Sequence, residues 1–260
     1  MYNPKDICLA EPDAVKSLDE APIEDQPNAG DTITMRLYSR LRQDIIEGTL
    51  PPGMKLKIED MSRSYEAGTS PVREALNLLT SFGLVERLHN RGFRVKPISA
   101  AEFADLLRVR CWLEERALRE AIAHGDEQWE ENIALALFRV NRAAKARVAS
   151  GEPRDAAWER RHRDFHMALL AGCGSPMLLD YCGQLFDQTI RYRQIAGALS
   201  MPVRDSEAEH AEIVEATLAR KADQAVELLM THYRTTGKYL LGRLFADAGE
   251  GGPLRYAQPN

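Results

Sequence analysis

The chain has 260 residues, of which 44% are hydrophobic and 28% are charged, as in an ordinary soluble protein of one or two domains. No apolar run approaches the ~20 residues that cross a bilayer, and the first thirty residues lack a secretory signal pattern, so we expect no membrane association. The four cysteines form no CxxC pair, which indicates a reduced, cytoplasmic compartment.

The net charge of −5 is unevenly distributed along the chain. Residues 1–30 hold two basic and seven acidic side chains, whereas residues 31–98 hold eleven basic and eight acidic ones, a balance of +3. The remainder, residues 99–260, is slightly acidic. Since a polyanion is attracted to positive charge, residues 31–98 are where nucleic acid would bind.

The segment that follows the acidic start has the element order of a winged helix-turn-helix. Apolar residues at helical spacing predict three helices between residues 32 and 83. Two short strands, Leu84–Leu88 and Phe93–Lys96, then flank the hairpin signal Asn90-Arg91-Gly92. The sequence therefore predicts three helices followed by a two-stranded wing.

From Ser99 onward every segment has helical periodicity, and glycines and prolines separate the segments. Six helices are expected, near residues 100–124, 126–150, 155–171, 175–197, 206–219 and 222–244. Helices joined by short loops form a bundle. The predicted fold is therefore mainly α.

Four parts are expected along the chain. They are a flexible N-terminal tail over residues 1–31, a winged helix-turn-helix DNA-binding domain over 32–97, an all-helical effector-binding and dimerisation domain over 98–245, and a flexible C-terminal tail over 246–260.

The run Ser70-Pro71-Val72-Arg73-Glu74-Ala75-Leu76, followed by Gly83-Leu84-Val85, resembles the GntR family of bacterial transcription regulators. The all-helical part behind it resembles the FadR-like branch of that family, with its FCD effector domain. The resemblance implies a regulator rather than an enzyme, most simply a repressor, whose affinity for operator DNA responds to a small-molecule effector. Helix-turn-helix proteins usually read two half-sites, so a homodimer is expected.

A recognition helix needs a polar first turn that reaches base edges and an apolar opposite face. The predicted DNA-contacting residues are Thr69, Ser70 and Arg73 of this helix and Arg91, Gly92, Arg94 and Lys96 of the wing. Arg73 can bind guanine or a phosphate, and Arg94 and Lys96 are better placed for phosphates. Most relatives have arginine where this chain has Thr69, and many have a basic residue where it has Glu59. The operator sequence therefore does not follow from the family.

Four of the six histidines fall on apolar faces of the predicted bundle: His162, His166, His210 and His232. The first two lie one turn apart on one helix, and the others belong to two further helices. Imidazoles that converge from three helices suit a divalent transition metal such as zinc or nickel. The sequence thus predicts a metal site inside the bundle.

The family resemblance supports this prediction and adds one departure. Metal-binding FCD domains have an aspartate four residues before the histidine of a Phe-His pair, and two more histidines about twenty-two residues apart. Phe165-His166 and the pair His210 and His232 match that pattern, whereas His162 stands where the aspartate is expected. Asp164 lies about 200° away around the helix and should not replace it.

Arg110 lies on the apolar stripe of its helix, and a buried guanidinium needs an anion. Glu114, one turn later, could supply that anion. Alternatively Arg110 binds the carboxylate of a small organic-acid effector, as the resemblance favours. Tyr192 and Arg193 are weaker candidates for the same effector pocket, since a solvated helix face explains them equally well.

Three other interpretations of the histidines remain open at this point. They could only pack the core, or they could bind an anionic effector directly without a metal. Glu159 to His162 and Glu207 to His210 also match the E-x-x-H signature of di-iron enzymes, although inward glutamates from two more helices are not evident. A plain dimerisation module would not need four inward histidines.

Overall fold

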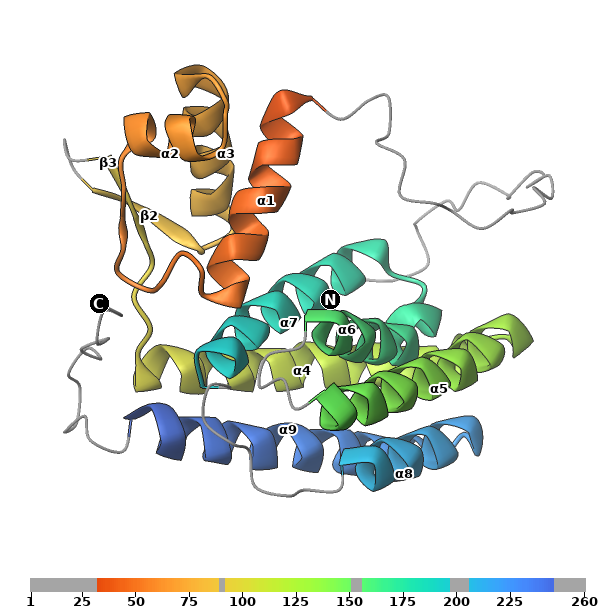
Figure 1. Cartoon of the computed structure of the whole chain (residues 1–260). Coiled ribbons are helices and arrows are strands. Elements are labelled where there is room, and N and C mark those ends of the chain that lie inside the picture. Colours follow the sequence, from red (N-terminus) through yellow and green to blue (C-terminus); the bar gives the residue numbers. More distant parts are fainter. Residues whose placement is uncertain (1–31, 89–91, 151–155, 197–205, 246–260) are drawn as a thin grey trace, which may run out of the picture. The chain divides into compact units, whose positions relative to one another are not determined.

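The computed structural model describes residues 32–88, 92–150, 156–196 and 206–245 (Figure 1). Over these ranges a winged helix-turn-helix is followed by a helical bundle, as the sequence predicts. None of the helices described there has the length and apolar character of a membrane span. The two predicted tails and Arg91 at the wing tip lie outside the described residues.

Within the described residues, the winged helix-turn-helix is built from three helices and three short strands. They are α1 (Ile33–Glu47), β1 (Lys55–Leu56), α2 (Ile58–Ser64), α3 (Thr69–Ser81), β2 (Val85–Leu88) and β3 (Gly92–Val95). Helix α1 packs against α3, and their apolar faces form one core with the sheet. In α3 the buried side chains are Val72, Ala75, Leu76 and Leu79, which leaves the opposite face of the helix exposed.

The sheet has one strand more than predicted. Its order is β1-β3-β2, with antiparallel pairing that sets Leu56 opposite Phe93 and Val85 opposite Val95. The expected two-stranded wing is therefore corrected to a three-stranded sheet. Strand β1 has only two residues, too few to show the alternation by which a strand is recognised in a sequence.

The bundle contains the six predicted helices. They are α4 (Ala100–His124), α5 (Glu127–Ser150), α6 (Ala156–Leu170), α7 (Pro176–Ala196), α8 (Ser206–Leu218) and α9 (Ala222–Phe245). Helix α4 begins where expected, because the Ser99 side chain accepts a hydrogen bond from the Glu102 backbone N–H at 3.2 Å. It packs against both α7 and α9, while α5 packs on α6 and α8 packs on α9 (Figure 1).

Large apolar side chains fill the core of the bundle. Phe103, Phe165 and Phe186, from three different helices, are almost completely buried. The indole N–H of Trp129 donates to the Ala168 carbonyl at 2.9 Å, which joins α5 to α6. Polar groups placed among these side chains are therefore removed from water and need partners within the protein.

Candidate metal and effector site

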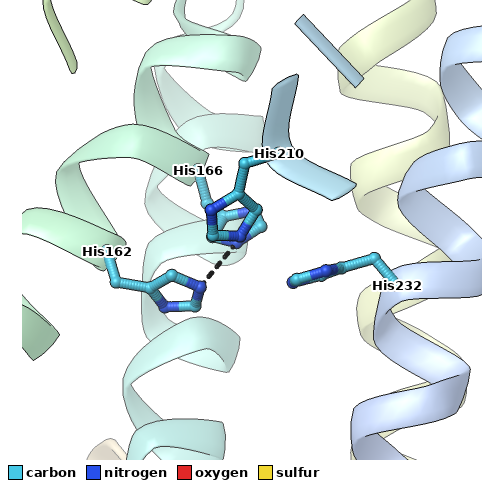
Figure 2. Close-up of side chains that lie close together, drawn as sticks. All are labelled: His162, His166, His210 and His232. Carbon is cyan, nitrogen blue, oxygen red and sulfur yellow. Dashed lines mark hydrogen bonds between the residues drawn. The ribbon is translucent and has the colours of Figure 1, made fainter. Parts of the chain in front are cut away.

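The structure brings the four singled-out histidines together. One potential ligand nitrogen from each of His162, His166, His210 and His232 lies within 4.8 Å of the others, and all four side chains are buried. Figure 2 shows the rings around a common centre, with two from α6 and one each from α8 and α9. The helical spacing of four residues sets the two α6 histidines on one face.

Aromatic side chains form the wall around these rings. Phe165 packs against His166 and His210, with ring centroids 5.1 and 4.6 Å apart. Phe186, from α7, packs against His162 and His166 at 5.8 and 5.3 Å. The imidazoles therefore lie in an apolar environment of low dielectric, where an uncompensated charge is costly.

This environment keeps His162 and His166 neutral. Burial lowers the pKa of His162 well below 6.5, and the positive charge of Arg193 lowers it further. Burial likewise lowers the pKa of His166, with added effects from His232 and His210. At neutral pH both rings are unprotonated, which is the form that binds a metal ion.

Two of the rings have an outer partner of the kind that metal-binding histidines usually have. Nδ1 of His232 lies 2.8 Å from Oε2 of Glu209. Nδ1 of His166 lies 2.9 Å from the hydroxyl of Tyr233. A carboxylate or a hydroxyl can accept a hydrogen bond from Nδ1–H, so that Nε2 of each ring keeps its lone pair for the centre of the cluster.

His162 has a different partner. Its Nδ1 lies 2.9 Å from Nη1 of Arg193, and its Nε2 lies 3.1 Å from Nε2 of His166 (Figure 2). Arg193 is itself almost buried and pairs with Glu159 at 3.3 Å. Arg193, one of the predicted effector residues, thus contacts a histidine of the cluster directly.

Arg110 joins the same region from α4. Its Nε donates to Oε1 of Glu114 at 2.5 Å, and the hydroxyl of Tyr233 donates to the other oxygen of that carboxylate. The guanidinium also lies over the rings of Tyr233 and Phe186, 4.0 and 4.3 Å from their centroids. Burial, with the nearby negative charge of Glu114, raises the pKa of Tyr233 well above 10, so its hydroxyl stays protonated.

One side of Arg110 remains available. Its Nη2 is buried and has no hydrogen-bond partner among the described residues. A buried donor without a partner costs about 1–3 kcal/mol, so the arrangement suits a ligand that the guanidinium can bind. Arg110 therefore pairs with Glu114 and still has a donor free for a ligand, whereas the sequence left these two roles as alternatives.

The cavity beside these groups is small. It has a volume of about 10 Å³ and is lined by Phe103, Leu107, Arg110, His162, Thr189, Arg193, His232, Tyr233, Thr236, Gly237 and Leu240. That volume suffices for about one water molecule, so an organic acid could enter only if side chains moved. Tyr192 is not among the lining residues, since its ring packs against Phe103 at 4.5 Å.

Sequence reasoning missed Tyr233, Glu209 and Glu159 as partners of the site. Tyr233 follows His232 directly, and its burial could be inferred from the apolar face of α9, but not its contact with Glu114. Glu209 precedes His210, yet it contacts His232 of another helix. Such contacts depend on how helices pack, which no spacing within one helix reveals.

The di-iron alternative does not agree with this geometry. Within the described ranges the clustered ligands are imidazoles alone. Glu159 pairs with Arg193, and Glu207 lies 3.9 Å from Lys145 near the surface. Neither glutamate of the two E-x-x-H matches contributes to the cluster.

The predicted DNA-contacting residues lie in three settings. Thr69, Ser70 and Arg73 are exposed on the first turns of α3. Gly92 is exposed at the start of β3, with a φ of 86° that favours glycine. Two basic residues of the wing are already paired within the chain, Arg94 with Glu86 and Lys96 with Glu102.

Helix α7 also contacts α1 of the DNA-binding part. Ile46 of α1 forms an apolar cluster with Phe186 and Ile190. The adjacent Asp187 accepts a hydrogen bond from Arg42 of α1 on one oxygen and from Arg163 of α6, at 2.8 Å, on the other. Phe186 thus touches the histidines on one side and α1 on the other.

Two family models match the chain: that of bacterial regulatory proteins of the gntR family over residues 33–95, and that of the FCD domain over residues 105–235. The HTH-type transcriptional repressor GlaR of Escherichia coli K12 is 36% identical over 202 residues, which are 76% of this chain and 91% of GlaR. The HTH-type transcriptional regulator BphR of Paraburkholderia xenovorans LB400 is 35% identical over 199 residues, 76% of this chain and 81% of BphR.

The structure of E. coli McbR/YncC is similar in fold, with a TM-score of 0.69 over 81% of this chain and 97% of that one. A regulator from Rhodococcus sp. RHA1 has a TM-score of 0.66 over 80% and 97%. The sequence identities are only 19% and 24%, so these two structures show a similar fold and nothing more about this chain.

Metal-free protein should lose stability as the pH falls below about 6.5. The pKa of His162 and His166 is lowered in the folded state, so the unfolded chain takes up protons first. Their contribution is complete above pH 6.5 and is lost as the pH falls towards the folded-state pKa, by up to roughly 1.4 kcal/mol per pH unit and ring. Urea unfolding in chelator between pH 7.5 and 5 measures this slope.

The matched comparison is between His162→Gln and His124→Gln. His124 is exposed, with 65% of its side chain accessible, so its replacement should leave the slope unchanged. His162→Gln should reduce the slope by the contribution of one ring. Equal slopes for His162→Gln and the unaltered chain would contradict the assignment of a neutral, buried His162.

Proposed function

This chain belongs to the FadR-like branch of the GntR family of bacterial transcription regulators, and on that premise we propose that it is a repressor controlled by an organic acid and a transition metal at the histidine cluster. It is a DNA-binding regulator with a ligand-binding domain, not an enzyme. The observation that carries the proposal is the convergence of four buried imidazoles beside the open edge of Arg110.

The donor set fits a divalent transition metal, zinc or nickel. The candidate ligands are His162, His166, His210 and His232, whose nitrogens lie close enough together to surround one ion. Zinc and nickel both accept imidazole, whereas calcium and magnesium prefer oxygen ligands. The bound ion would supply a Lewis-acidic position for a carboxylate.

The charges around the cluster favour an anionic effector. Neutral imidazoles leave the charge of a divalent ion uncompensated. Arg110 is balanced by Glu114 and Arg193 by Glu159, while Glu209 contacts His232 of the cluster. A small carboxylate that bound the ion could also accept a hydrogen bond from the open Nη2 of Arg110.

DNA binding is assigned to α3 and the wing. Thr69, Ser70 and Arg73 are exposed on the first turns of α3, where a recognition helix meets base edges. Arg91 and Gly92 would approach the minor groove from the wing. Arg94 and Lys96 would exchange their glutamate partners for DNA phosphates.

The regulator would act on operator DNA in the cytoplasm as a homodimer, since helix-turn-helix proteins usually bind paired half-sites. A monomeric mass in light scattering of the DNA-bound protein would contradict the homodimer.

We assign the coupling between effector and DNA to α7. Phe186 packs against His162, His166 and Arg110, so a ligand that moves these groups also displaces α7. Asp187, the next residue, holds Arg42 of α1. Closely packed side chains transmit such shifts because an interior has no free volume to absorb them.

The metal site is tested by elemental analysis of the untagged chain purified without chelators. We expect about one zinc or nickel per chain, and loss of that metal in His210→Ala. Two irons per chain would contradict this site. Absence of metal from both samples, even after zinc and nickel are supplied, would instead indicate that the histidines bind the effector directly or only pack the core.

Arg73→Ala should weaken operator binding by roughly 5- to 150-fold, because a bidentate arginine contact contributes about 1–3 kcal/mol. Fluorescence anisotropy with a duplex selected from random sequences measures the change, and circular dichroism checks the fold. Arg116→Ala, an exposed arginine of α4 that pairs with Glu120, is the control and should bind normally. Unchanged binding by Arg73→Ala would exclude α3 as the recognition helix.

Asp187→Asn should uncouple the metal from the operator. In the unaltered chain we expect metal loading to change operator affinity by at least about fivefold, the lower end of ordinary allosteric coupling. In the variant that ratio should approach one, while metal content stays the same. Asp105→Asn, which alters an exposed acid paired with Arg108, should retain the full ratio; equal ratios in both variants would contradict the α7 route.

A further inference from the structure

Resting on the metal site proposed above, we infer that only three of the four histidines hold the ion. His166, His210 and His232 are its ligands, and His162 presents its Nε2–H to an anion bound beside the ion. The inference depends on the hydrogen-bond chemistry of Arg193, which contacts His162 on the outer side of the ring.

Arg193 determines which nitrogen of His162 carries the proton. Its Nη1 lies 2.9 Å from Nδ1 of His162, and a guanidinium can donate hydrogen bonds but cannot accept them. Nδ1 must therefore be the acceptor. A neutral imidazole has one proton, which is then on Nε2, the nitrogen that points towards the cluster. A nitrogen that carries a proton has no lone pair for a metal.

Three further hydrogen bonds lead from His162 through His166 and Tyr233 to Glu114, and each is consistent with a proton on Nε2 of His162. The Nε2–H of His162 donates to Nε2 of His166 at 3.1 Å (Figure 2). The proton of His166 is then on Nδ1, where it donates to the Tyr233 hydroxyl at 2.9 Å. Tyr233 in turn donates to Glu114. Each donor in this chain of three hydrogen bonds meets an acceptor, so a proton on Nε2 of His162 agrees with these contacts.

The other outer partners are of the opposite kind. Glu209 can only accept, which keeps the proton of His232 on Nδ1 and leaves its Nε2 available for a metal. The Tyr233 hydroxyl accepts from His166 with the same result. His162 is thus distinguished from these two rings by a donor-only partner.

Arg193 is held firmly in this position. Its side chain is only 11% exposed and pairs with Glu159 at 3.3 Å. Its guanidinium lies 4.9 Å from the ring of Trp158, and Trp158 stacks on His162 at 4.7 Å with planes 16° apart. For Nε2 of His162 to bind the metal, its proton would have to move to Nδ1, and the buried guanidinium of Arg193 would then lose the acceptor it now contacts. Leaving a buried cation without that partner is unfavourable.

Once a metal occupies Nε2 of His166, the Nε2–H of His162 needs another acceptor. Three histidines leave one position of a four-coordinate ion open to an outside ligand. His162 and Arg110 line the same cavity, and Arg110 has its own unpartnered donor there. A carboxylate on the ion would accept from both. His162 is therefore a specificity residue for the anionic effector.

The test uses the full chain loaded with Co²⁺, whose visible absorption reports its ligands, and acetate as the anion. His162→Gln retains an N–H donor and should bind one Co²⁺ per chain within about threefold of the unaltered affinity. His166→Gln, the same change one turn later, should weaken Co²⁺ binding by at least about 100-fold, more than loss of an outer partner does. Competition with a chelator measures both affinities.

Acetate provides the second measurement. It should shift the visible bands of the Co²⁺-loaded unaltered chain, because one position is exchangeable. His162→Ala should retain the metal but bind acetate roughly tenfold more weakly or worse, since a hydrogen bond to a charged group is lost. Arg193→Met should free Nδ1, let His162 become a fourth ligand, and thereby tighten Co²⁺ binding and abolish the acetate shift.

The outcomes separate this inference from the proposed metal site. Equal loss of Co²⁺ in His162→Gln and His166→Gln, or no acetate shift in the unaltered chain, would establish a closed four-histidine site and overturn the inference alone. An Arg193→Met variant that behaves like the unaltered chain would overturn the role given to Arg193. Failure of the unaltered chain to bind Co²⁺ at all would overturn the metal site together with the inference.

Discussion

The bundle places four imidazoles, two guanidinium groups and their carboxylate partners among fully buried aromatic rings, and the arrangement depends on satisfying those polar groups without water. Arg110 is paired with Glu114, Arg193 with Glu159, and His232 with Glu209. The last two pairings join α6 to α7 and α8 to α9, and the hydroxyl of Tyr233 in α9 donates to Glu114 of α4. An unpaired charge in this position would cost several kcal/mol, so the helices cannot shift independently of the groups they carry.

The same constraint explains why the site suits a regulator. A cavity of about 10 Å³ admits no organic acid, so a ligand can bind only by displacing side chains that are already in contact with one another. Phe186 is one of these, and it also packs against Ile46 of the DNA-binding part. A ligand that displaced Phe186 would therefore also disturb the packing at α1.

The partners of the individual rings differ in a way that residue types alone conceal. All four rings are imidazoles, yet Glu209 accepts a hydrogen bond from His232 whereas Arg193 donates one to His162. A histidine here can thus serve either as a metal ligand or as a hydrogen-bond donor. Which of the two it does is decided by the group that contacts its Nδ1. A count of histidines would therefore not by itself give the number of ligands in the proposed metal site.

The sequence by itself determined the element order, the winged helix-turn-helix and the six-helix bundle, because helical periodicity, glycines, prolines and the Ser99 cap are local signals. It also placed the four histidines and Arg110 on apolar faces. Only the tertiary structure decided the two-residue strand β1, the separation of Tyr192 from the cavity, and the contacts of Tyr233, Glu209 and Arg193. Those depend on how helices far apart in the chain pack, since a side chain's partner across an interface is set by the crossing of two helices and not by the periodicity of either.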